Sequence, residues 1–468
     1  IPLAYLKEEE LNRLKDYILN QLDSSELEIR LTTLDIIDEI FSELKDKGGF
    51  LAALDSWIRN NLQISPYPSE NYLKFKLARK LNMEEDILNI LENNYKGVEE
   101  NTSEIYLKNL KTATEWMDKK LNIDILYDQV KKSPKTFGLY TGMHFCNLLK
   151  VSAMEKVRNY AGHTLLHIFK FLSQEERNDI AIELLRALEM QNYQFTKYIP
   201  DYLGRLLLYL QPTELDEVID DLEEKVRLSN TQIVFLLLKT IGVCIENYPE
   251  YAKRFDESKI SNKRRLERLL GLLLNGMVSF NDEIKTEAFR IIGSQIFNSS
   301  KLSLEDKHNI FILIGKKILT LLPKKEDDEF VFLSNSSSLN SIYRFILDYE
   351  LNYGSIRIKE HKRIAFFPGS FDPFSLSHKK IVTEIKEKGF EVYLAVDEFS
   401  WSKRTQPHRF RRYIINIAIA HERDVYLFPS QIPINISNDK DLSKLKSLFK
   451  NKELFIVVGT DVLVNASA

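Results

Sequence analysis

The segment GSFDPFSLSH, residues 369–378, places a glycine, several hydroxyl groups, an aspartate and a histidine close together. Glycine at position 369 allows the backbone to approach a ligand closely, because it has no Cβ atom. If a helix follows this turn, its first N–H groups are unpaired and lie in positive potential. Together with the imidazole of His378, such groups suit an anion, and phosphate commonly binds at helix N-termini.

The surrounding sequence predicts a parallel α/β sheet that would hold this segment at the end of a strand. Strand-like and helix-like segments alternate after Lys362, a pattern typical of parallel sheets with helical crossovers. We expect strands at 363–369, 391–399, 424–430 and 453–461, and helices at 379–390, 408–422 and 441–450. Ligands bind beyond the carboxyl ends of the strands in such sheets, and the segment 369–378 falls there.

The same segment resembles the signature of the HxGH nucleotidyltransferases, especially the nicotinate or nicotinamide mononucleotide adenylyltransferases. The family pattern is G-[ST]-F-D-P-x-H-x-G-H, and the matching positions are Gly369, Ser370, Phe371, Asp372, Pro373 and His378. The segment VVGTD (457–461) is similar to the family's G-x-D after its fourth strand. Arg411 precedes the second helix much as a family arginine does. The resemblance covers residues 363–468 and implies a Rossmann-like domain.

This resemblance implies transfer of a nucleoside monophosphate, expected to be adenylyl, from ATP or CTP to a phosphate-bearing acceptor such as nicotinate mononucleotide. Pyrophosphate would leave, and Mg²⁺ would be carried by the triphosphate. The family roles fall on His378 and Ser375 as catalytic contacts. Those implied for nucleotide or phosphate binding are Gly369, Ser370, Phe371, Asp372, Lys403, Arg404, Arg411, Gly459 and Asp461. Capping of the turn explains Asp372 equally well.

Two positions and the end of the chain depart from the family pattern. Ser375 stands where the family has its first histidine, and Ser377 stands where it has glycine. The sequence ends at Ala468 before any [ST]-x-x-R segment like that of the family, so we expect an incomplete domain. These departures keep a second interpretation open. In it, the protein is a helical-repeat interaction scaffold with a degenerate, non-catalytic nucleotide-binding domain.

The residues before this domain are expected to form helical repeats, giving a division into 1–354 and 362–468. Apolar residues recur with helical spacing along most of 1–354. The helix openings at 155–158 (EKVR) and 282–285 (DEIK) resemble those of HEAT or armadillo-type repeats. One helix pair is too small to bury its apolar face, so such pairs stack into a solenoid. We expect this region to bind a protein partner, and we expect 323–340 to form an exposed loop.

Two polar patterns in the helical region have simpler explanations than ligand binding. HTLLH (163–167) spaces two histidines as zinc proteases do, but Thr164 replaces the glutamate that serves as general base there. NKRRLER (262–268) gathers cations at a helix start. That gathering hints at a phosphate-bearing partner, but a solvated helix face accounts for it better. A nucleic-acid partner is therefore not expected.

Composition excludes several classes of protein. A net charge of −3 over 468 residues gives no general attraction to nucleic acid or anionic membranes. Cys146 and Cys244 lie far apart, so neither a disulfide framework nor a cysteine zinc site is expected. No apolar run approaches the ~20 residues of a membrane span. We expect a cytoplasmic protein, and a start at IPLAYLKEEE without Met is consistent with a fragment of a longer chain.

Overall fold

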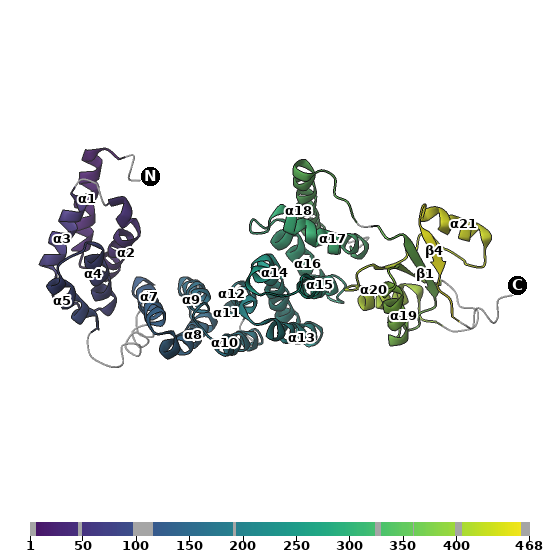
Figure 1. Cartoon of the computed structure of the whole chain (residues 1–468), viewed down its shortest axis with the longest axis horizontal. Helices are drawn as coiled ribbons and strands as arrows, with labels where there is room; N and C mark the ends of the chain where they lie inside the picture. The colour runs from purple at the N-terminus through teal and green to yellow at the C-terminus, as the bar shows by residue number, and fades with distance from the viewer. Residues whose placement is uncertain are drawn as a thin grey trace. The chain divides into compact units, whose positions relative to one another are not determined.

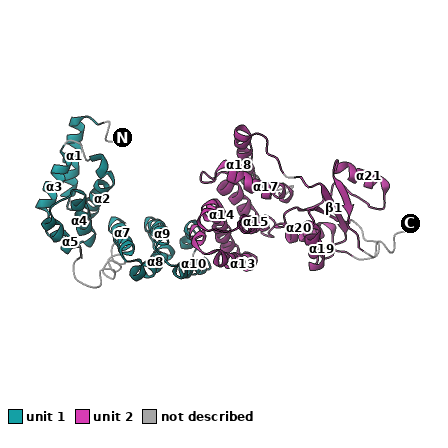
Figure 2. Ribbon diagram, in the orientation of Figure 1, with its two compact units in different colours: residues 1–202 teal, residues 203–468 magenta. Residues whose placement is uncertain are grey.

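The chain folds as helices followed by a small parallel sheet, in a computed structural model (Figure 1). The structure describes residues 6–44, 49–96, 116–190, 193–322, 329–358, 360–397 and 405–459, without the side chains of 95–96 and 329–334. Two compact units make up the chain, residues 1–202 and residues 203–468 (Figure 2). The prediction of a helical region followed by an α/β part is therefore confirmed.

The first unit is built from amphipathic helices. Their bounds are α1 Glu8–Leu22, α2 Leu27–Leu44, α3 Phe50–Asn60, α4 Pro68–Lys80, α5 Glu85–Lys96, α7 Trp116–Lys132, α8 Pro134–Val151, α9 Glu155–Ile168, α10 Gln174–Ala187, α11 Tyr193–Thr196 and α12 Ile199–Leu206. Leu31, Leu34 and Ile37 of α2 are buried at the predicted helical spacing. Within the described ranges of the whole chain, no helix is both long and apolar enough to cross a bilayer.

The second unit begins with helices and ends with the sheet. After a short 3₁₀ turn at Leu207–Tyr209, the helices are α13 Pro212–Leu228, α14 Thr231–Arg254, α15 Lys259–Gly276, α16 Asp282–Arg290, a π-helical segment Ile291–Phe297, α17 Leu304–Leu321 and α18 Glu329–Tyr353. The change from helix to strand falls between Tyr353 and Arg363, inside this unit. The predicted division of the chain at 354–362 stays a prediction.

Helix α18 shows that the expected loop at 323–340 is wrong for residues 329–340, which are helical; residues 323–328 lie outside the described part. The reason is close packing of small side chains. Ser338 is buried, and a Cβ atom placed on Gly293 would lie 2.5 Å from the Cα atom of Ser338. Two small residues thus bring α18 and the π-helical segment together, and this tertiary contact outweighs the loop-like composition of the Ser/Asn cluster.

The sheet has four parallel strands in the order β3-β2-β1-β4. The strands are β1 Arg363–Gly369, β2 Glu391–Val396, β3 Val425–Leu427 and β4 Glu453–Ile456. They lie at the predicted places: β1 has its predicted bounds, and β2, β3 and β4 end earlier than predicted. The order reverses next to β1, because β2 lies on one side of it and β4 on the other.

Helices cover both faces of this sheet (Figure 1). Helices α19 (Leu376–Glu387) and α20 (His408–Ile419) pack on one face, where Val382 and Ile415 meet Phe367 of β1. Helix α21 (Asp439–Leu448) packs on the other face, where Leu445 meets Phe366. Because successive side chains of a strand point to opposite faces, the adjacent residues Phe366 and Phe367 anchor the two layers.

Candidate functional site

The turn that follows β1 is shaped by Phe371 rather than by open space for a ligand at Gly369. Phe371 is buried and has a φ of 45°, a left-handed conformation that a bulky residue rarely adopts. A Cβ atom on Gly369 would lie 3.0 Å from the Phe371 ring. Glycine at 369 therefore leaves room for this ring, which a Cβ atom would push away by a few tenths of an ångström. The turn places Ser370 and Asp372 at the carboxyl edge of the sheet.

Ser375 and His378 form the N-terminal cap of α19. The backbone N–H of Ser375 donates to His378 Nδ1 at 3.0 Å, and the Ser375 hydroxyl lies 2.9 Å from the same nitrogen. The Ser375 Oγ atom also accepts from the backbone N–H of His378 at 3.4 Å. This is a capping box in which histidine takes the place usually held by glutamate or glutamine. The family resemblance implied that both residues contact phosphate, and the structure brings the two into contact with each other.

The hydrogen bonds of this cap assign the tautomer of His378. A backbone N–H can only donate, so Nδ1 must accept and the neutral ring carries its proton on Nε2. Within the described part of the chain, Nε2 has no hydrogen-bond partner. The imidazole also packs against Phe371 and Phe374, with ring centroids 5.2 and 5.6 Å away. Burial lowers the pKa of His378, which favours the neutral ring.

Asp372 connects the turn to the start of α20. Its Oδ2 atom accepts the backbone N–H of Gln406 at 2.9 Å. The rest of the carboxylate is exposed. Asp372 thus has a structural partner 34 residues away along the chain, and the structure leaves its second oxygen facing solvent.

Arg411 is buried, whereas the sequence predicted a phosphate-binding residue. It is only 1% exposed. Its Nε atom donates to the carbonyl of Gln406 at 2.8 Å, Nη2 donates to the carbonyl of Asp397 at 2.9 Å, and Nη1 donates to the carbonyl of Ser370. Each of its three nitrogens is therefore engaged with backbone oxygen. The guanidinium holds together the segments that follow β1 and β2 and precede α20.

The remaining predicted residues lie partly outside the described ranges. Gly459 is described and exposed, three residues after the end of β4. Hydrogen bonding of the Val457 N–H to the Phe366 carbonyl at 2.8 Å keeps this segment beside β1. Gly459 therefore follows β4 at the same edge of the sheet as the β1 turn. Lys403, Arg404 and Asp461 lie outside the described residues.

The sequence reasoning missed two residues at this edge. Asp397 follows β2 directly, and partial burial raises the pKa of its carboxyl while nearby Arg411 opposes that rise. Arg412 donates from Nη1 to the carbonyl of Phe428, just after β3, at 2.9 Å. A signal for Asp397 existed, because a charged residue rarely ends a buried strand without a ligand or a capping partner. No sequence signal separates Arg412 from its neighbours.

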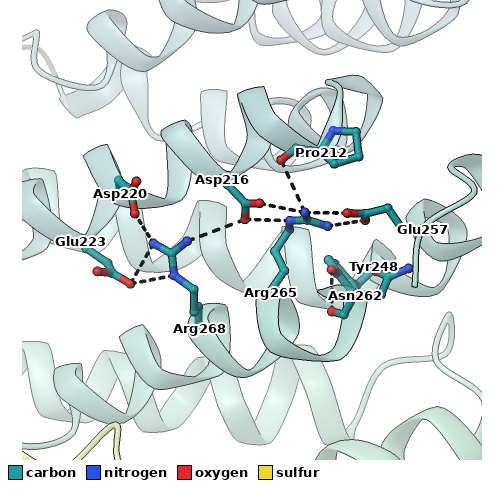
Figure 3. A network of polar contacts seen from close by, with 9 residues as sticks. All are labelled: Pro212, Asp216, Asp220, Glu223, Tyr248, Glu257, Asn262, Arg265 and Arg268. Atoms are coloured by element: carbon teal, nitrogen blue, oxygen red, sulfur yellow. Dashed lines mark hydrogen bonds and ion pairs between the residues drawn. The ribbon is translucent and has the colours of Figure 1, made fainter. Parts of the chain in front are cut away.

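Two of the four cations in the cluster 262–268, Arg265 and Arg268, are paired with carboxylates of the chain (Figure 3). Arg265 is 3% exposed and forms paired contacts with Asp216 of α13 and with Glu257 at 2.7–3.0 Å. Arg268 contacts Glu223 and Asp220 of the same helix α13. These two arginines therefore fix α15 against α13, so the expected solvated helix face is wrong for Arg265 and holds for the exposed Lys263 and Arg264.

The histidines of HTLLH both contact aromatic rings, His163 with Tyr202 at 5.3 Å and His167 with Tyr127 at 6.1 Å. Across the described ranges, no group of three or more His, Cys, Asp or Glu side chains is arranged to hold a metal ion. Cys146 and Cys244 are buried as free thiols, and burial raises the pKa of each to about 12.

Comparison of the sequence with protein-family models found no match, and comparison with curated proteins found none either.

Proposed function

We propose that residues 363–468 form a Rossmann-like nucleotidyltransferase domain with its site at the carboxyl edge of β1 and β4. The observation that carries this proposal is the β1–turn–α19 arrangement, with Ser375 and His378 at the first turn of the helix. It stands where the strand order reverses, between β1 and β4. In open parallel sheets such a switch point is the usual place for a nucleotide.

Three donors at this position support binding of a phosphate chain. The backbone N–H groups of Leu376 and Ser377 have no partner among the described residues, as expected for the first turn of a helix. The Nε2–H of His378 is the third donor. All three belong to one helix N-terminus, whose dipole favours an anion. The neutral His378 ring donates without needing a positive charge, so its contribution does not require acidic pH.

The reaction that suits these donors is transfer of a nucleoside monophosphate from ATP or CTP to a phosphate-bearing acceptor such as nicotinate mononucleotide. An acceptor phosphate oxygen attacks the α-phosphorus, and the bond to the bridging oxygen of pyrophosphate breaks. Catalysis of this kind needs positioning and stabilisation of charge on the phosphoryl oxygens more than covalent participation. His378 would donate a hydrogen bond to oxygen atoms of the α- and β-phosphates, and Ser375 would hold the His378 ring in place. Mg²⁺ would enter with the triphosphate.

Pyrophosphate release tests this proposal. The whole chain would be assayed with Mg²⁺, nicotinate mononucleotide and either ATP or CTP, beside His378→Ala and the matched control Lys380→Ala, which changes an exposed residue of the same helix. We expect release by the wild type and the control, and a loss of roughly 100-fold or more in His378→Ala, typical of removing a transition-state donor. Absence of release with both nucleotides, or equal rates in His378→Ala, would refute the enzymatic proposal.

A second candidate function is an interaction scaffold whose α/β domain is non-catalytic, with the helices of residues 1–354 stacked as a HEAT-like solenoid that binds a protein. The burial of Arg411 favours this candidate, because the cation expected to meet phosphate is committed to backbone carbonyls. Unaltered unfolding of the chain in the presence of ATP and CTP, together with no pyrophosphate release, would support the scaffold over the enzyme.

A further inference from the structure

Two consecutive lysines of α17 reach the α/β part at the amino-terminal ends of its strands, opposite the candidate site. Lys316 pairs with Glu391, the first residue of β2, and donates to Tyr393 Oη at 3.0 Å. Lys317 Nζ donates to the carbonyl of Ile419 at 2.7 Å and to the carbonyl of Val425. Ile419 ends α20, and Val425 begins β3. Lys317 thus joins a helix of the helical part to two elements of the α/β part.

The surroundings of Lys317 suit a neutral amine better than an ammonium group. The side chain is 2% exposed. A neutral amine has two N–H donors, and two carbonyl oxygens receive them. The third N–H of an ammonium group finds no acceptor in the described part of the protein, and no carboxylate there forms an ion pair with Lys317. Burial lowers the pKa of Lys317 to about 7.

The carboxylates near Lys317 are already paired with other cations. The charged and titratable groups that face it are Glu267 of α15, Lys386 of α19, Glu391 of β2, Tyr426 of β3, Lys316 of α17, and His421, Glu422, Arg423 and Asp424 after α20. Glu422 contacts Lys386 at 2.6 Å. Arg423 contacts both Glu267 at 2.8 Å and Asp424 at 3.2 Å. These pairings leave Lys317 without a counter-charge of its own.

A small cavity gives water a place beside Lys317. It lies between α15 and α17 and is lined by Leu270, Leu274, Leu313 and Ile314 as well as by Glu267, His421 and Arg423. Protons can therefore exchange at the amine without separation of the helices.

We propose that Lys317 makes the packing of α17 on α20 and β3 responsive to protons, with the contact tightening as its amine loses a proton. In a separated state the lysine would be exposed and would titrate at its ordinary pKa of about 10.5, whereas the packed lysine titrates near 7. Between these values the separated state binds a proton that the packed state lacks. As the pH falls, the ratio of the separated to the packed state therefore rises by up to about tenfold per pH unit. Below pH 7 this ratio no longer depends on the protonation of Lys317.

The contact made by Lys317 and the candidate site both involve helix α20. Lys317 holds the last carbonyl of α20, and Arg411 in the first half of that helix holds the carbonyls of Ser370 and Asp397. The proposal itself concerns packing and does not depend on the proposed enzymatic function.

Unfolding of the whole chain as a function of pH tests the proposal. Wild type would be compared between pH 6.5 and 9.5 with Lys317→Met, which keeps the length of the side chain, and with Lys263→Met, which removes an exposed charge from α15. We expect the folded-to-unfolded ratio of the wild type to gain up to about tenfold per pH unit over Lys317→Met above pH 7. Lys263→Met should follow the wild type. Parallel curves for wild type and Lys317→Met would overturn the proposal.

Direct titration of the lysine keeps the test decisive if Lys317→Met does not fold. Nuclear magnetic resonance of ¹³Cε-labelled lysine in the wild type should show one resonance titrating near pH 7, well below the others. A finding that every lysine of the folded wild type titrates near its ordinary pKa would overturn the proposal independently of any variant.

Discussion

Replacement of Arg411 by methionine tests whether this buried arginine supports the carboxyl edge of the sheet. Methionine keeps much of the apolar length of the side chain but donates no hydrogen bond. The carbonyls of Ser370, Asp397 and Gln406 would lose their shared donor. A buried acceptor left without a partner costs about 1–3 kcal/mol. Because this edge lies near solvent, water replaces part of the loss, and we take the lower value for each carbonyl.

The expected loss for Arg411→Met is therefore about 3 kcal/mol in the free energy of unfolding. For a unit as large as residues 203–468, about 2–4 °C per kcal/mol gives a melting temperature lower by roughly 6–12 °C. Differential scanning calorimetry of the whole chain measures this shift. Arg409→Met, an exposed position on the same helix, serves as the control and should change little. Equal shifts for the two variants would refute the assignment of Arg411 as a support of the backbone.

Three further predictions concern other contacts of the fold. Burial raises the pKa of Asp124 from 3.8 to about 6, so the free energy of unfolding falls by about 3 kcal/mol as the pH rises through this range. Asp124→Asn should therefore raise the melting temperature at pH 8 and leave it unchanged at pH 4. Equal gains at both pH values would contradict this. Gly293→Leu should destabilise the second unit by about 2 kcal/mol or more in denaturant unfolding, because its side chain would overlap α18 at Ser338; a neutral effect would contradict the close packing. Lys316→Met leaves the buried Glu391 unpaired and should lower the free energy of unfolding by about 2 kcal/mol. Adding Glu391→Leu to this variant should largely restore the lost stability. No recovery in the double variant would argue against the pair.

The sequence predicted the strand and helix positions of the α/β part because apolar runs there are bounded by clear turn signals. Gly389, for example, has a φ of 84° just after α19, as a glycine that ends a helix commonly does. The predicted carboxyl ends of β2, β3 and β4 were too far along the chain: β4 ends at Ile456 instead of continuing to Asp461. Apolar character alone does not show where hydrogen bonding to the neighbouring strand stops.

The sequence predicted the residues of the β1 turn but not how each of them is used. Ser375 and His378 were expected to contact phosphate, and the structure shows that they also cap α19 together, a contact between neighbours in the chain. Arg411 was expected to face a ligand, and its actual partners are carbonyls of three separate segments that only the fold brings together. Long-range contacts of this kind leave no local pattern, and the same reason explains why Arg412 and Lys317 were missed.

Isothermal titration calorimetry with Mg²⁺-ATP and Mg²⁺-CTP tests the central claim most directly, which is that the first turn of α19 binds a nucleotide phosphate chain. The account predicts saturable binding of at least one nucleotide to the whole chain, with affinity about tenfold or more weaker in His378→Ala, as expected on losing a hydrogen bond to a charged group. Lys380→Ala should bind as the wild type does. No binding heat from either nucleotide, or an undiminished affinity in His378→Ala, would contradict it.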